Sequence, residues 1–103
     1  MNIIIILSNE FDNDLKINHE TVLRANKGYQ YYNDGDIIFT LGWNGGFKTE
    51  SISEKVKEYL IGNFSINHES IISIPSSKDT VGDAFFSREY IEQKNLNYNN
   101  IYI

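Results

Sequence analysis

Cysteine is absent from the sequence, and this limits the chemistry that the chain can perform. Without a thiol there is no disulfide, no thiolate nucleophile and no zinc–thiolate site. A chain without cysteine suits a reducing compartment, so we expect a cytoplasmic location.

Clustered basic residues and long apolar runs are missing as well. The nine Lys and Arg residues are scattered and the formal net charge is −5, so the basic surface that nucleic-acid binding requires is not visible. The apolar run at residues 3–7 is too short to span a membrane, and no basic segment precedes it as in a signal peptide. We therefore predict neither a nucleic-acid partner nor a membrane span.

Apolar, β-branched runs alternate with stretches of helical periodicity along the 103 residues, a length that suits one domain. Strands are predicted at residues 3–7, 37–41, 71–74 and 101–103, and helices at residues 19–32, 51–61 and 79–94. Strands and helices in this order form parallel sheets with right-handed crossovers. The prediction is a three-layer α/β/α Rossmann-like sandwich with strand order 3-2-1-4.

Local signals mark the helix ends. Asn18 is a predicted N-cap of the first helix, and the sequence Ser51-Ile52-Ser53-Glu54 matches a capping box for the second. Gly62 is predicted to end the second helix, because glycine commonly follows the last helical residue.

The segment that joins the third strand to the third helix carries the main candidate site residues of the chain. Pro75 closes the strand, and an apolar stripe then begins at Val81. The stripe has the spacing of one helix face. Its apolar members are Val81, Ala84, Phe85 and Ile91, and Arg88 interrupts it.

Hydroxyl and carboxylate side chains stand at this junction, at Ser77, Asp79 and Thr80. Such residues commonly cap a helix by accepting hydrogen bonds from its free N–H groups. The same residues at the carboxyl end of a parallel strand also commonly hold a ligand. The spacing alone leaves both interpretations open.

A glycine-rich loop follows the second strand, at residues 42–46. Glycines let backbone N–H groups approach an anion at a helix N-terminus, although this loop is neither a P-loop nor a dinucleotide fingerprint. Trp43 in this loop either stacks on a ligand or packs on the surface, and we favour packing.

Acidic residues offer two further candidates. Glu10, Asp12 and Asp14 follow the first strand, where they could bind a divalent cation or form a solvated loop. Asp79 and Asp83 are four residues apart and could share a proton or a metal. We favour solvation for the first group, whereas for the second pair helix-dipole stabilisation and solvation are nearly as good an explanation. We assign neither a metal site nor a catalytic residue.

Residues 77–84, Ser-Lys-Asp-Thr-Val-Gly-Asp-Ala, resemble the Ser-x-Asn/Asp-Thr-x-x-Asn-Ala motif of the YdcF/SanA-like family, which is long catalogued as a domain of unknown function. Gly45 and Gly46 match that family's glycine turn, and Arg24 matches an arginine in its first helix. Asp83 stands where the family usually has asparagine. The resemblance covers the chain but only the first part of the family's domain, so we expect that a later segment with His and Arg is missing.

The resemblance implies a ligand-binding site made of Gly45, Gly46, Ser77, Asp79, Thr80, Asp83 and Arg24. The expected ligand is a nucleotide-type or phosphate-bearing small molecule, and S-adenosylmethionine is a candidate by analogy with the fold. One alternative is a hydrolase or transferase acting on a phosphorylated cell-envelope precursor, with Asp79 or Glu10 as base or metal ligand. Another is a non-catalytic fragment that dimerises through its last strand. The sequence leaves the ligand and the oligomeric state open.

Overall fold

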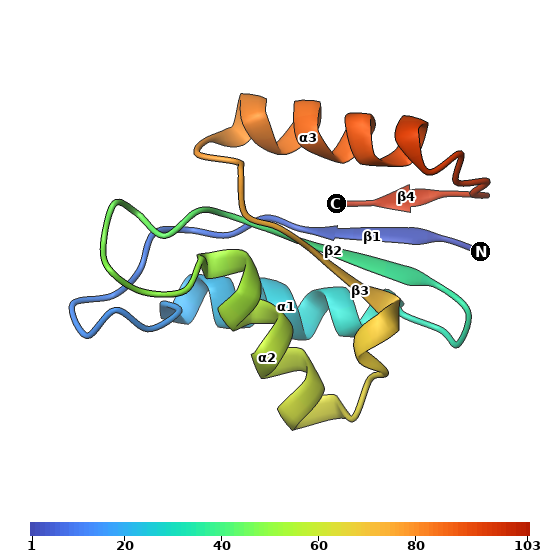
Figure 1. Ribbon diagram of the computed structural model, residues 1–103. Helices are drawn as coiled ribbons and strands as arrows, with labels where there is room; N and C mark the ends of the chain where they lie inside the picture. Colours follow the sequence, from blue (N-terminus) through green and yellow to red (C-terminus); the bar gives the residue numbers. More distant parts are fainter.

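A four-stranded parallel sheet lies at the centre of the computed structural model, which describes residues 1–103 (Figure 1). The strand order is β3-β2-β1-β4, as the sequence predicted. In chain order the elements are β1 (Ile3–Ile6), α1 (His19–Tyr31), β2 (Ile37–Leu41), α2 (Ile52–Phe64), a short 3-10 helix η1 (His68–Ser70), β3 (Ile71–Ile74), α3 (Thr80–Gln93) and β4 (Ile101–Tyr102).

β1 lies between β2 and β4 and pairs with both strands. Ile3 pairs with Ile37 of β2 on one side and with Ile101 of β4 on the other. The four isoleucines of β1 are all buried, which explains why this strand is apolar on both faces. Because both faces of β1 are buried, the helices that connect the strands must cover both faces of the sheet.

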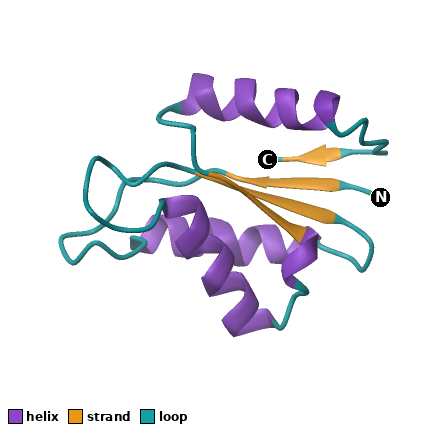
Figure 2. Cartoon of the chain, viewed as in Figure 1, coloured by secondary structure: helices purple, strands orange, loops and turns teal.

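α1 and α2 cover one face of the sheet, and α3 covers the other (Figures 1 and 2). The core between the sheet and α1 with α2 contains buried residues such as Ile4, Ile38 and Leu60. The core on the α3 side centres on Phe39, and Tyr90 of α3 meets that ring edge-to-face with ring centroids 5.3 Å apart. The fold is thus the predicted α/β/α sandwich.

The predicted N-caps Asn18 and Ser51 are confirmed, and of the candidates at the start of α3 it is Asp79 that caps the helix. Asn18 accepts a hydrogen bond from the Thr21 amide, and Ser51 accepts one from the Glu54 amide. Asp79 accepts one from the Gly82 amide at the start of α3. Each side chain satisfies an N–H group that the helix itself leaves free.

The predicted end of α2 at Gly62 is wrong, because the helix continues to Phe64. Ser65 ends it in the left-handed conformation, with φ of 55°. The extra turn brings the Phe64 ring onto Tyr29 of α1, with centroids 4.0 Å apart. Stacking of the two rings outweighs the local preference of glycine for a helix end.

The α3 helix forms where the apolar stripe predicted it, but the stripe is not the face that packs. Val81 is 78% exposed and Phe85 is 50% exposed. Phe86 and Tyr90 pack against the core of the sheet, together with Ile91, which is the one member of the stripe that does so. α3 carries apolar side chains on two sides, so periodicity alone could not select the buried one.

No helix of the structure is both long and apolar enough to cross a bilayer.

Candidate functional site

Three loops meet at the carboxyl edge of the sheet, on the left of Figure 1. They are residues 7–18 after β1, residues 42–51 after β2 and residues 75–79 after β3. The last of them carries the chain from the face covered by α2 to the face covered by α3. Together the loops line an open cavity of about 710 Å³. Ligands of open α/β sheets bind at such an edge.

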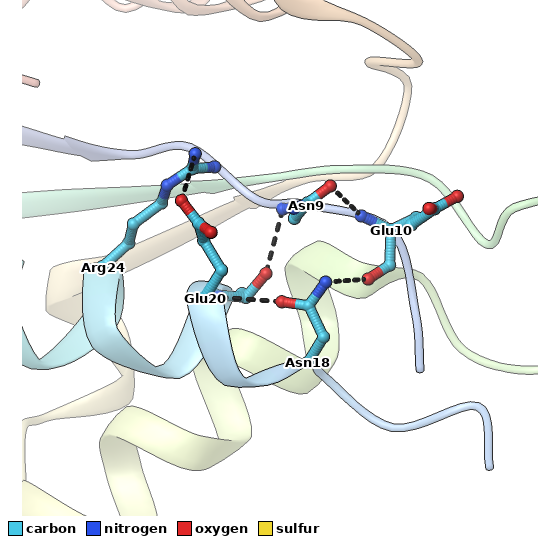
Figure 3. A network of polar contacts seen from close by, with 6 residues as sticks. Asn9, Glu10, Asn18, Glu20 and Arg24 are labelled. Atoms are coloured by element: carbon cyan, nitrogen blue, oxygen red, sulfur yellow. Dashed lines mark hydrogen bonds and ion pairs between the residues drawn. The ribbon is translucent and has the colours of Figure 1, made fainter. Parts of the chain in front are cut away.

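The loop after β1 is held against the start of α1 (Figure 3). The Asn9 amide donates to Thr21 Oγ1 over 2.9 Å, and Asn18 Nδ2 donates to the Glu10 carbonyl oxygen over 2.8 Å. Asn18 Oδ1 meanwhile caps the helix by accepting from the Thr21 amide. These bonds fix the backbone of Asn9 and Glu10, so that both residues line the cavity.

The turn between β3 and α3 is organised by a buried hydroxyl. Ser77 is 1% exposed and its Oγ donates a hydrogen bond to the Asp83 carboxylate. The Asp79 carbonyl oxygen lies 3.1 Å from the same Oγ. Gly82 fits between these side chains, because a Cβ there would lie 3.2 Å from Asp79 Oδ1 and 3.3 Å from Ser77 Oγ. Ser77 therefore positions the Asp83 carboxylate and the Asp79 backbone at the wall of the cavity.

Asp83, in the first turn of α3, has a shifted pKa. Burial raises the pKa of its carboxyl group, and the neighbouring charge of Asp79 raises it further. The hydrogen bond from Ser77 acts in the opposite direction, but burial is the larger effect. A half-buried carboxylate with a raised pKa at the wall of a cavity can accept a proton from a bound molecule.

The glycine loop after β2 forms the wall opposite this turn. Gly45 has φ of 70° and lines the cavity, together with Trp43 and Phe47. Lys78 from the β3–α3 turn places its Nζ 4.7 Å from the centroid of the Trp43 ring. The prediction that Trp43 packs on the surface is thus too simple, since this ring both contacts Lys78 and borders the cavity.

Five of the seven predicted ligand residues come together at the cavity. They are Gly45, Ser77, Asp79, Thr80 and Asp83. Gly46 is in the same loop but does not line the cavity, and its amide donates to Asn44 Oδ1 over 2.9 Å.

Arg24 lies away from the cavity, on α1. It forms an ion pair with Glu20 at 3.2 Å, and Figure 3 shows the two side chains next to each other. Arg24 borders a separate hollow of about 220 Å³ beside Tyr31 and Tyr102. Arg24 was matched to the family by its position in the sequence, and the structure does not bring it to the other six residues.

Several cavity residues were not singled out by the sequence. Ser8 donates to the Leu41 carbonyl oxygen over 2.6 Å and thereby ties the ends of β1 and β2 together. Phe11 and Lys78 also line the cavity. Their one usable signal is position, because each follows a strand of a parallel sheet.

The acidic groups of the first loop do not assemble as a three-carboxylate site. Glu10 and Asp12 line the cavity, whereas Asp14 does not. Asp12 Oδ1 instead accepts from the amides of Asp14 and Lys16, over 2.9 Å and 3.0 Å. These bonds stabilise the turn.

Another group of three carboxylates lies on and beside α2, at Glu50, Glu54 and Glu58, with oxygens within 4.8 Å of one another. A hydrogen bond with Glu50 is the main cause that raises the pKa of Glu58. This group is outside the cavity, and clustered exposed acidic side chains are common without a metal.

Comparison of the chain with family models, with curated proteins and with solved structures finds no match. The resemblance to the YdcF/SanA-like family stays a prediction.

Proposed function

We propose that this chain binds a nucleotide-type small molecule in the cavity at the carboxyl edge of its sheet. The observation that carries the proposal is the cavity itself, of about 710 Å³, at the point where the chain passes from one face of the sheet to the other. Its volume is within the range of small-molecule sites, and its place is the one that α/β folds use for ligands.

The side chains around the cavity suit a molecule with a flat base and a sugar. Aromatic rings of Phe11, Trp43 and Phe47 provide surfaces on which a base can stack. The Thr80 hydroxyl and the carboxylates of Glu10 and Asp12 can bond the hydroxyls of a ribose. S-adenosylmethionine belongs to this ligand class, and membership of the YdcF/SanA-like family would be consistent with it.

A second candidate is a hydrolase or transferase that uses the same cavity. The observation in its favour is Asp83, whose carboxyl group is half-buried, borders the cavity and has a raised pKa. In this case Asp83 accepts a proton from the attacking group of the substrate. The substitution Asp83→Asn would then abolish turnover and leave ligand binding in place.

Thermal unfolding in the presence of adenosine nucleotides and S-adenosylmethionine tests the proposal. A ligand at a hundredfold excess over its Kd stabilises the folded state by about 2.7 kcal/mol, and the midpoint of unfolding rises accordingly. Thr80→Val removes an exposed hydroxyl of the cavity and should reduce the shift. Arg24→Gln, outside the cavity, should leave it unchanged.

The proposal fails if no compound of this class raises the midpoint of a chain that still unfolds cooperatively. It fails equally if Thr80→Val and Arg24→Gln reduce the shift to the same extent, because the ligand would then bind elsewhere.

A further inference from the structure

Charged side chains around the cavity are mostly acidic. Four carboxylates line it, at Glu10, Asp12, Asp79 and Asp83, against the single ammonium group of Lys78. They come from both sides of the opening, since two follow β1 and two belong to the β3–α3 segment. A cavity lined by charges of one sign concentrates ligands of the opposite sign.

The ammonium groups near the cavity already have partners. Lys78 Nζ lies over the Trp43 ring, 4.7 Å from its centroid. Lys55 Nζ donates to the Leu15 carbonyl oxygen over 2.8 Å and lies 5.1 Å from the centroid of Phe11. Neither lysine has to be neutralised by a bound phosphate.

The N-terminus of α3 is occupied in the same way. Asp79 Oδ1 accepts from the Gly82 amide over 2.7 Å, so a carboxylate of the chain occupies the position that a phosphate takes at an open helix N-terminus. A phosphate brought to this turn would meet the charges of both Asp79 and Asp83. Repulsion between like charges makes that contact unfavourable.

The aromatic rings point to the same ligand charge. Phe11 and Trp43 line the cavity, and each already has a lysine ammonium group over its face. An aromatic face attracts cations through its quadrupole. Rings and carboxylates together form a lining that favours positive charge.

We infer that the ligand of this cavity is a cation, a nucleoside-type molecule that carries an amine or another positive group and no phosphate. This inference rests on the proposed function and restricts it, because it excludes nucleoside phosphates from the ligand class. The carboxylates of Glu10 and Asp79 provide the selectivity, and the exposed ring of Phe47, which no lysine covers, provides a stacking surface.

Three probes with the same base and sugar separate the effect of the ligand's charge from the effects of its base and sugar. They are adenosine, adenosine monophosphate, and the adenosine analogue in which a primary amine replaces the phosphorylated hydroxyl. Titration calorimetry of the full chain at neutral pH measures the Kd of each. We expect the amine to bind about tenfold more tightly than adenosine, and the phosphate to bind more weakly than adenosine.

Matched substitutions locate the effect. Asp79→Asn removes a charge but retains an excellent N-cap, so α3 should stay intact. We expect Asp79→Asn and Glu10→Gln each to reduce the preference for the amine several-fold. Asp34→Asn makes the same charge change in the turn before β2, outside the cavity, and should leave the preference unchanged.

The outcomes are distinct. Tighter binding of adenosine monophosphate than of the amine would overturn the inference and leave the proposed function standing. Binding of none of the three probes would overturn both. A preference for the amine that is unchanged in both Asp79→Asn and Glu10→Gln would overturn the assignment of the selectivity to these two carboxylates.

Discussion

The two faces of the sheet differ in the number of buried residues that pack against them. On one face α1 and α2 enclose a cluster of nine buried residues, whereas α3 alone covers five buried residues on the other. Thr40 on the first face donates its hydroxyl to the Ser53 carbonyl oxygen over 2.8 Å. On the second face the buried Ser87 hydroxyl has no hydrogen-bond partner.

The cavity is lined by segments that belong to both faces of the sheet. Its β1 and β2 loops lead into α1 and α2, on the deeply packed face, while Asp79, Thr80 and Asp83 belong to the thinly packed α3 segment. Segments with few buried apolar contacts open more readily than the core. We infer that the wall formed by Asp79, Thr80 and Asp83 opens more readily than the walls formed by the loops after β1 and β2.

The largest expected effect is on core packing. Leu60→Ala on α2 should lower the free energy of unfolding by about 3 kcal/mol, because Leu60 is fully buried. Ile91→Ala on α3 should cost about 1 kcal/mol, because Ile91 is only partly buried. Urea unfolding measures both. Equal losses would show that the two faces are packed alike.

Hydroxyl groups should give a smaller effect, of opposite sign on the two faces. Thr40→Val removes a buried hydrogen bond and should destabilise the fold by about 1 kcal/mol. Ser87→Ala removes an unpaired hydroxyl and should stabilise it by up to about 1 kcal/mol. Thermal unfolding under identical conditions measures the difference. A loss of stability in Ser87→Ala would mean that this hydroxyl has a partner.

The smallest expected effect concerns the pH dependence of stability. Because the pKa of Asp83 is raised in the folded state, the folded protein binds the proton more readily than the unfolded chain. The free energy of unfolding should therefore fall as pH rises from the ordinary aspartate pKa through the raised one. Asp83→Asn keeps an acceptor for Ser77 and should be more stable than the parent at neutral pH, with a gain that disappears in acid.

Unfolding of the parent and of Asp83→Asn across this pH range measures the gain. A gain that is constant with pH would show that Asp83 titrates alike in the folded and unfolded states.

Strand positions and helix starts could be predicted because they depend on local signals. Apolar β-branched runs such as residues 3–6 define buried strands, and Asn18, Ser51 and Asp79 cap helices through bonds within three residues. The handedness of the crossovers limits the topologies but does not fix the order, which was expected from the Rossmann-like pattern together with the family resemblance.

Tertiary contacts decided what the sequence could not show. The end of α2 depends on the stacking of Phe64 on Tyr29, and the buried side of α3 depends on the ring of Phe39. In the candidate site, Asp79 and Asp83 were predicted from a motif that is contiguous in sequence. The contact between Lys78 and Trp43 joins two separate loops, and no spacing in the sequence reveals such a pair.

The position of β1 between β2 and β4 has a consequence for how the chain folds. The pairing of Ile3 with Ile37 needs only the first βαβ unit, but the pairing with Ile101 joins nearly opposite ends of the chain. Closing so long a loop is entropically slow. One edge of β1 therefore stays unpaired until β4 forms, and during that time it can pair with a strand of another chain.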